Sequence, residues 1–178
     1  AGAGTQSKLI AKHYKLFYLD TGKIYRHIGL LRIKYKTKLT YGIIRKNILK
    51  LNMKLLTNNK LLTDEVAISA SIVARDKKVR DIVHKFQQKC AYDPPKKFNG
   101  SVLDGRDITS IQVKDAMFKF FITASLITRA KRRFEEYRKL KKNISLNEVL
   151  KSIRKRDKLD RKRKYGPLIK TKDSILIN

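Results

Sequence analysis

Charged side chains suited to holding phosphate follow an apolar stripe near the end of the 178-residue chain. Residues 145–148 (SLNE) form a capping box, which predicts a helix beginning there. The apolar face of that helix continues, by steps of three and four residues, into Arg156, Asp160 and Arg163. Two interpretations stay open from this helix alone. The charges contact a ligand, or they form intrahelical ion pairs worth ~0.3–0.5 kcal/mol each.

Two further polar groups follow predicted strands. Residues 104–107 (DGRD) come directly after an apolar stretch at 101–103, and residues 20–26 (DTGKIYR) come after another at 16–19. Ligands of open α/β sheets bind at the carboxyl ends of strands. Arg106 offers a planar fork for phosphate, and Asp107 can accept hydrogen bonds from a base amino group. The alternatives are a tight turn with a surface Arg–Asp pair at 104–107, and an ordinary turn before a helix at 20–22.

The first five residues, AGAGT, form a glycine-rich fragment. Phosphate-binding loops use the backbone N–H groups of glycines, a lysine for the β- and γ-phosphates, and a Ser or Thr for magnesium. The glycines and Thr5 are present, Ala3 precedes Gly4, and the fragment has no lysine. By itself the fragment is a poor match to such a loop.

Strands that alternate with helices are expected to position these groups, which predicts an α/β fold with a parallel sheet. Residues 21–63 carry only basic charges and are expected to form a basic, poorly specified insert. The predicted helices cover 6–15, 24–33, 63–88, 125–140 and a segment from 145 that ends before Gly166-Pro167; the predicted strands cover 16–19, 101–103, 117–123 and 174–178, with a loop at 92–100.

Composition limits the classes of protein. The chain has 44 Lys and Arg against 15 Asp and Glu, a formal charge of +29, which predicts attraction to polyanions. An AT-rich coding sequence would produce the same mixture without a partner. Apolar residues make up 42%, enough for a core, and no apolar run is long enough for a membrane span. A single cysteine, Cys90, excludes a disulfide framework and favours a reducing, cytoplasmic setting.

Taken in order, the motifs resemble those of bacterial cytidylate kinases, which phosphorylate CMP and dCMP with ATP. The likeness covers nearly the whole chain, and the ordered set is specific although each piece is weak. The matching segments are 2–5 (the end of the P-loop), 19–26 (D-[ST]-G-x-x-Y-R), 65–80 (E-V-x-x-x-A-S-x-V-A with a later V-R), 104–108 (D-G-R-D), 120–133 (F-x-x-A with R-A-x-R-R) and 156–163 (the lid).

The resemblance implies a fold and a division of the chain. The fold is a P-loop nucleoside-monophosphate-kinase-like parallel sheet flanked by helices, with the first central strand missing from this chain. The core kinase domain takes residues 1–31 and 64–178 and includes a helical lid at about 141–166. Residues 32–63 make a short, reduced insert for binding the nucleoside monophosphate.

The resemblance also implies that the chain is a phosphotransferase that moves the ATP γ-phosphate to CMP or dCMP. Catalytic roles would fall to Arg106, Asp107, Arg156 and Arg163. CMP would be bound by Thr21, Arg26, Ser71, Arg80, Arg106, Asp107, Asp160 and Arg163, among which Ser71, Arg80 and Asp107 would read the cytosine edge. ATP would be bound by Gly2, Ala3, Gly4, Thr5, Arg129 and Arg133, with Mg²⁺ held through Thr5.

Other interpretations remain beside this one. Ala3 stands where the family has the loop lysine, so one alternative is a kinase-like protein that binds nucleotides with impaired turnover. The charge of +29 suggests a basic RNA-binding protein, but the sequence has no RNP-like motif and no recognition helix. We therefore expect ATP and CMP or dCMP as partners, a monomer, and no binding to nucleic acid or membranes.

Overall fold

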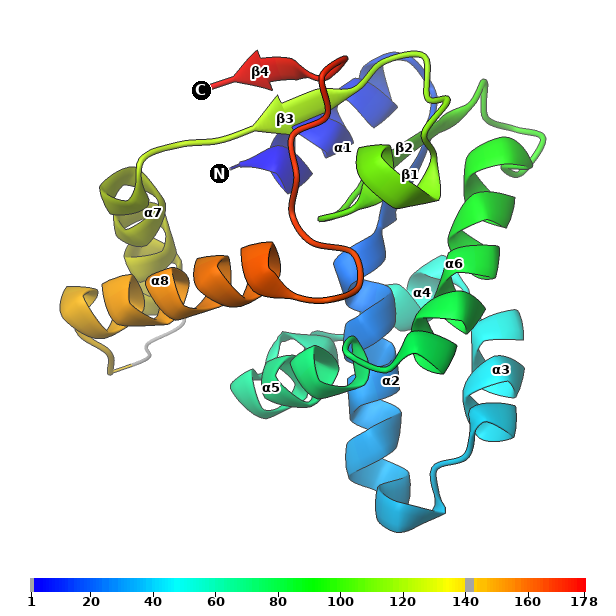
Figure 1. Ribbon diagram of the computed structural model, residues 1–178, viewed down its shortest axis with the longest axis horizontal. Coiled ribbons are helices and arrows are strands. Elements are labelled where there is room, and N and C mark those ends of the chain that lie inside the picture. Colours follow the sequence, from blue (N-terminus) through cyan, green and yellow to red (C-terminus); the bar gives the residue numbers. More distant parts are fainter. Residues whose placement is uncertain (1, 140–142) are drawn as a thin grey trace.

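A computed structural model describes residues 2–139 and 143–178 as helices packed around short parallel strands (Figure 1). The predicted α/β class is confirmed. The helices are α1 (Ala3–His13), α2 (Thr21–Tyr35), α3 (Tyr41–Leu49), α4 (Met53–Leu56), α5 (Asp64–Val73), α6 (Lys77–Tyr92), α7 (Leu126–Lys139) and α8 (Leu146–Lys162). The strands are β1 (Phe17–Asp20), β2 (Ser101–Asp104), β3 (Phe120–Ile122) and β4 (Ile175–Ile177).

The described strands form two separate parallel pairs rather than one continuous sheet. β1 pairs with β2 so that Asp20 stands opposite Asp104 at the carboxyl ends. β3 pairs with β4 from Phe120 opposite Ile175 to Ile122 opposite Ile177. All four predicted strands are present, but β3 and β4 are shorter than the apolar stretches at 117–123 and 174–178. Parallel pairing is confirmed, and a single sheet is not seen among the described strands.

Helix α2 lies at the centre of the core. Leu19, Ile24, Ile28 and Val83 are completely buried where β1, α2 and α6 meet. α5 lies directly against α2, and a Cβ added to Gly29 would stand 2.7 Å from the backbone nitrogen of Ala70. A side chain at position 29 would therefore force the two helices apart.

The insert at 32–63 is folded, so the prediction of a poorly specified segment is wrong. It contains the last turn of α2, the helices α3 and α4, and two 3₁₀ turns, Lys36–Lys38 and Asn59–Leu62. Thr40 and Asn52 cap the two α-helices by accepting hydrogen bonds from backbone N–H groups. Ile44 and Ile48 are buried in the central core. Basic residues occupy the exposed faces of these helices. The high charge of the segment therefore obscured the apolar positions that face the core.

The helix predicted over 63–88 is two helices. α5 ends at Val73, and Asp76 begins α6 by accepting a hydrogen bond from the backbone N–H of Val79 at 3.2 Å. An N-cap aspartate needs a non-helical backbone, and this is the physical reason for the break. The break also exposes the carbonyl of Ala74, which accepts a 3.4 Å hydrogen bond from Arg80 Nη1.

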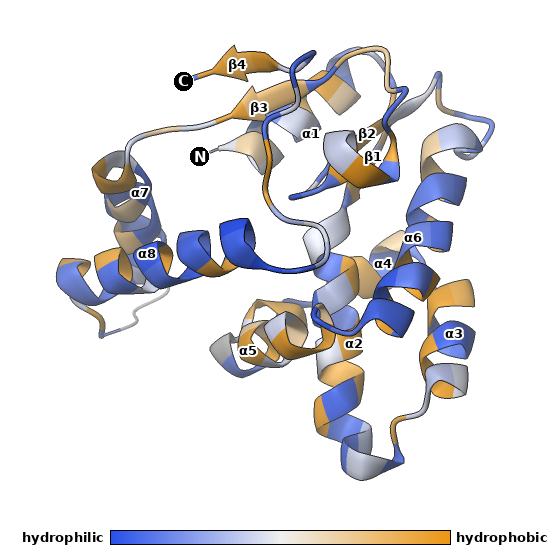
Figure 2. Ribbon diagram, in the orientation of Figure 1, coloured by the Kyte–Doolittle hydropathy of each residue, from blue (hydrophilic) through white to orange (hydrophobic). Residues whose placement is uncertain are grey.

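The remaining helical predictions are confirmed. α8 begins with the expected capping box, in which Ser145 and Glu148 each bond the other's backbone N–H. Apolar colour follows β3 and β4 while the end of α8 is hydrophilic (Figure 2). Within residues 2–139 and 143–178, no helix is both long enough and apolar enough to cross a membrane.

Candidate active site

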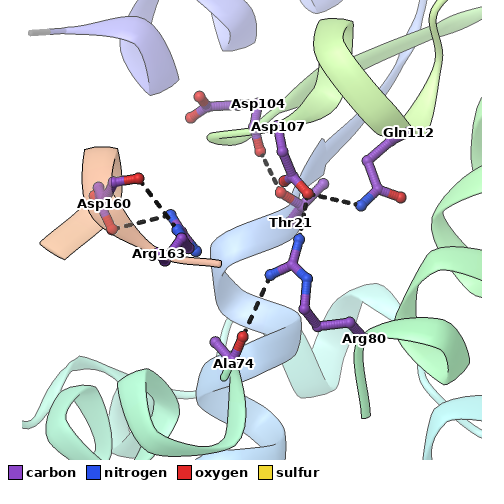
Figure 3. Close-up of polar contacts among 8 residues, drawn as sticks. All are labelled: Thr21, Ala74, Arg80, Asp104, Asp107, Gln112, Asp160 and Arg163. Atoms are coloured by element: carbon purple, nitrogen blue, oxygen red, sulfur yellow. Dashed lines mark hydrogen bonds and ion pairs between the residues drawn. The ribbon is translucent and has the colours of Figure 1, made fainter. Parts of the chain in front are cut away.

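The carboxyl ends of β1 and β2 and the start of α2 form one polar edge (Figure 3). Thr21 Oγ1, in the first turn of α2, donates a 2.8 Å hydrogen bond to the carbonyl of Asp104. Gly105 follows β2, and a Cβ there would stand 2.3 Å from Thr21 Oγ1. The DGRD turn therefore needs glycine at its second position so that it can pack on α2.

A buried ion pair lies beside this edge. Arg80 of α6 and Asp107 contact each other through Nη2 and Oδ2, with side chains only 8% and 7% exposed. Gln112, at the end of the π-helical turn Ile108–Gln112, donates a 2.9 Å hydrogen bond from Nε2 to the same Asp107 oxygen. Gly166 covers the pair, since a Cβ there would stand 2.0 Å from Arg80 Nη2.

Asp160 of α8 holds a second group of charges. Its Oδ1 accepts a 2.9 Å hydrogen bond from Arg163 Nη2. Its Oδ2 lies 3.1 Å from Arg106 Nε and 3.9 Å from Arg156 Nε. Three guanidinium groups thus share one carboxylate. The intrahelical pairs proposed as the alternative do form, and Arg106 joins them from the DGRD turn, 54 residues away in sequence.

The charge around Arg156 is strongly positive. Desolvation and the charge of Arg106 lower the pKa of Arg156, Asp160 opposes this, and Arg26 and Arg133 lower it further. Arginine stays protonated under all ordinary conditions, so the lowered pKa reflects desolvation and neighbouring positive charge rather than a titration. Arg26 also donates a 2.7 Å hydrogen bond from Nη1 to the carbonyl of Leu61 in the insert.

The start of α1 lies between the end of β2 and α7. A Cβ on Gly4 would stand 3.0 Å from Asp104 Oδ2, and a Cβ on Gly2 would stand 3.6 Å from Arg132 Nη1. Thr5 is exposed and Ala3 is half-buried. These contacts bring residues 2–5 close to the helix that carries Arg129 and Arg133.

The two α7 arginines predicted to bind ATP have protein partners. Arg129 forms a 2.7 Å ion pair with Asp157 of α8 and donates a 3.0 Å hydrogen bond to the carbonyl of Ala124. Arg133 pairs with Glu136 at 2.8 Å and lies over the ring of Tyr137. Arg129 therefore ties α7 to the lid helix, while the charge of Arg133 lies close enough to Arg156 to lower the pKa of that side chain.

The carboxylates of Asp20 and Asp104 lie near each other and near Arg106. Burial and then the charge of Asp20 raise the pKa of Asp104, against the opposing charges of Arg106 and Lys8. The Tyr18 hydroxyl, which faces the same carboxylates, has its pKa raised by burial and then by Asp20 and Asp104. A cation between the two carboxylates would relieve their repulsion. Across the described part of the chain, no three His, Cys, Asp or Glu side chains gather as a metal-binding group.

The structure brings most predicted site residues together, with one exception and two additions. Ser71 is exposed on α5, where its hydroxyl donates a 2.7 Å hydrogen bond to the carbonyl of Ile68 in its own helix. No local sequence motif marks Gln112. Gly166-Pro167 predicts only the end of a helix, whereas the structure gives Gly166 a φ of 61°, which is the reason glycine is needed there.

A sequence profile described as cytidylate kinase matches residues 1–178. A cytidylate kinase of Clostridium botulinum (strain Langeland) is 36% identical over 189 residues, covering 100% of this chain and 85% of the relative. One of Bacillus pumilus is 33% identical over 193 residues and covers 100% and 84%. One of Caldanaerobacter subterraneus is 35% identical over 189 residues and covers 100% and 82%.

The chain belongs to the cytidylate kinase family. Membership confirms the family that the ordered motifs predicted, and the small parallel sheets among helices fit its P-loop nucleoside-monophosphate-kinase fold. The profile spans the whole sequence, so the basic insert and the lid segment both fall within the cytidylate kinase match.

Proposed function

We propose that this chain transfers the γ-phosphate of ATP to CMP or dCMP, giving CDP or dCDP. The observation that carries the proposal is the group of guanidinium ions on Asp160. Arg106 and Arg163 contact that carboxylate directly, and the charges of Arg26 and Arg156 lie close by. Phosphoryl transfer needs positioning and charge neutralisation rather than a basic side chain. A site with several arginines and one carboxylate has that character.

The Arg80–Asp107 pair supports recognition of the cytosine base. Asp107 is 6% exposed, and both of its donors contact Oδ2. Oδ1 has no hydrogen-bond donor among the described residues, so it is available to accept from an amino group of a ligand. Uracil has a carbonyl where cytosine has that amino group and would meet acceptor against acceptor. Ser71 would take part after a change of its rotamer.

We assign ATP to the side formed by Gly2, Ala3, Gly4 and Thr5 with Arg129 and Arg133. Mg²⁺ bound with ATP would neutralise the charge that develops on the transferred phosphate. Thr5 follows Gly4 in the first turn of α1, and the Asp20 and Asp104 carboxylates would supply the oxygen ligands that Mg²⁺ prefers. Oxygen donors beside Gly4 fit a magnesium–nucleotide complex.

The proposed chain has three parts, a core, an insert and a lid. The core takes residues 1–31 and 64–178, the insert takes 32–63, and the lid takes about 141–166. α8 in the lid carries Asp160, and its Asp157 holds Arg129 of the core at 2.7 Å. Lid closure over both nucleotides would exclude water that would otherwise hydrolyse ATP. We also propose that the protein is a cytoplasmic monomer whose partners are its small-molecule nucleotide substrates.

The test is ADP formation with CMP, dCMP, UMP and AMP as acceptors. We expect turnover with CMP and dCMP in preference to the others. Arg106→Ala should remove phosphate binding, and Asp107→Ala should reduce the preference for CMP. Turnover with no preference for cytosine nucleotides would overturn the proposal.

A second candidate is a nucleotide-binding protein with impaired turnover, and Ala3 in place of the loop lysine supports it. Loss of one preorganised positive donor costs a hundredfold to a thousandfold in rate, or ~2.7–4 kcal/mol. Ala3→Lys should then raise kcat by a comparable factor while the affinity for CMP stays the same. If Ala3→Lys does not raise kcat above that of the wild type, this candidate is excluded.

A further inference from the structure

Gln112 is buried beside the proposed base site although it carries a full polar amide. It is 2% exposed and ends the π-helical turn that follows the DGRD motif. Its backbone N–H bonds the carbonyl of Asp107 at 3.2 Å, so the turn folds back on the aspartate. Its side-chain Nε2 then reaches Asp107 Oδ2 at 2.9 Å (Figure 3).

The two donors on Asp107 come from different elements. Arg80 approaches from α6 and Gln112 from the turn Ile108–Gln112, and both meet Oδ2. Two donors from two directions fix the plane of a carboxylate more firmly than one. They also leave Oδ1, which receives no hydrogen bond from the described residues, as the oxygen available to a ligand.

We infer that Gln112 is a positioning residue that sets the base specificity of this site by holding Asp107 as a fixed hydrogen-bond acceptor. The inference rests on the proposed function. A base that presents an amino group at Oδ1, as cytosine does, is accepted. A base that presents a carbonyl there, as uracil does, is rejected because the carboxylate can neither turn nor donate.

Packing alone does not account for the glutamine. Gln112 Oε1 is buried, and no described group donates a hydrogen bond to it. An apolar side chain of the same length would fill the space without that desolvation cost. What the amide adds over an apolar side chain is its donor to Asp107.

The chain offers a matched control in Gln87 of α6. Gln87 is 1% exposed, and its Oε1 also lacks a described hydrogen-bond donor. Its side chain makes no hydrogen bond to Asp107 within the described residues. Gln112→Met and Gln87→Met are thus the same chemical change at two equally buried sites, and only the first removes a donor from Asp107.

The experiment measures the affinities for CMP and UMP by titration calorimetry, together with kcat and KM, for the wild type and both variants. Gln112→Met should weaken CMP binding about tenfold or more, because a hydrogen bond to a charged group is lost, and should reduce the CMP-to-UMP ratio by a similar factor. Its kcat at saturating CMP should change little. Gln87→Met should leave the ratio unchanged even where it lowers Tm.

The outcomes separate the two claims. A wild type without preference for CMP overturns the proposed function and this inference together. The inference alone is overturned if the wild type prefers CMP and Gln112→Met has the same CMP-to-UMP affinity ratio as Gln87→Met. Should Gln112→Met fail to fold, Gln112→Leu decides in the same assays. Its apolar side chain donates nothing to Asp107, so it should reduce the preference for CMP in the same way.

Discussion

Gly166 packs against the guanidinium of Arg80, at the point where the chain leaves the lid helix and returns to the core. A Cβ at position 166 would stand 2.0 Å from Arg80 Nη2 and 2.5 Å from Asp107 Oδ2. The backbone at Gly166 has a φ of 61°, a value that residues other than glycine rarely adopt. The end of the lid therefore touches the proposed base site directly, and this contact tolerates no side chain.

Gly166→Ala should weaken CMP binding and destabilise the protein. The left-handed backbone costs an alanine about 1 kcal/mol, and the clash adds to this by moving Arg80 or the lid. We expect the KM for CMP to rise about tenfold or more and Tm to fall, as measured by steady-state kinetics and a thermal melt.

Gly42→Ala is the matched control for that substitution. Gly42 lies in α3, where an added Cβ would meet only Thr40 Oγ1 at 3.7 Å. Alanine is favoured over glycine within a helix by ~0.5–1 kcal/mol, so this variant should be as stable as the wild type or more so. Normal CMP affinity in Gly166→Ala would contradict the contact between the lid and the base site.

Arg80→Met should be among the most destabilising single substitutions in this protein. It leaves Asp107 buried with only Gln112 as a donor, and breaking a buried pair in this way costs ~3–5 kcal/mol. Urea denaturation of Arg80→Met, Asp107→Leu and the double variant measures the coupling. The double variant should recover part of the loss, because no unpaired charge stays buried.

The exposed pair Arg138–Glu135 serves as the comparison, since those side chains are 65% and 57% exposed. Arg138→Met should leave the free energy of unfolding unchanged within error, because solvent screens such pairs. Equal effects of Arg80→Met and Arg138→Met would show that the Arg80 pair does not stabilise the fold.

Local signals explain which elements the sequence could predict. The strands at 16–19 and 101–103 are short apolar runs closed by Asp, Thr or Gly, and the capping box at 145–148 fixes the start of α8. The break at 74–76 also had a signal in Asp76, but the apolar spacing continues across it and suggests one helix. Thr40 and Asn52 marked helix starts in the insert in the same way.

Long-range relationships were predictable only through the family resemblance. Nothing local to Arg106 or Asp160 says that the two charges meet at 3.1 Å, because that contact depends on how the lid packs against the DGRD turn. The division of the strands into two parallel pairs is likewise a matter of tertiary pairing. The role of Gln112 could not be predicted for the same reason, since a lone glutamine between Ile111 and Val113 forms no motif.

Asp104→Asn should stabilise the protein at neutral pH while reducing activity. The pKa of Asp104 is raised in the fold by burial and by Asp20, so the folded state binds a proton more tightly than the unfolded state. Stability therefore falls as pH rises from the ordinary Asp range through the raised pKa, and the full penalty is present at neutral pH. Asparagine carries no charge and removes that penalty.

Urea denaturation at about pH 4 and about pH 7 measures this effect. The wild type should lose more stability between the two values than Asp104→Asn does. Asp81→Asn, at an exposed position on α6, is the control and should keep the wild-type dependence on pH. A wild-type dependence retained in Asp104→Asn would mean that this carboxyl is not the group responsible.

The arginines on Asp160 predict stabilisation by phosphate ligands. A ligand that binds only the folded state at ~100 times its Kd adds about 2.7 kcal/mol, which corresponds to a rise in Tm of about 5–10 °C for a domain of this size. CMP should produce a shift of this order. Arg106→Met and Arg163→Met should each remove most of it, because each loses a guanidinium that contacts Asp160 at 3.1 or 2.9 Å.

Arg154→Met tests whether position matters beyond total charge. Arg154 lies exposed on α8, the helix that carries Asp160, and its loss changes the net charge by the same amount. If the arginines act as a cluster, Arg154→Met keeps the CMP-induced rise in Tm and Arg106→Met does not.

If the formal charge of +29 alone attracts the phosphate, the variants behave alike and each shift shrinks with added salt to the same extent. Melts with and without CMP at two salt concentrations separate the two cases, because a cluster in a partly enclosed site is screened less than an even surface charge.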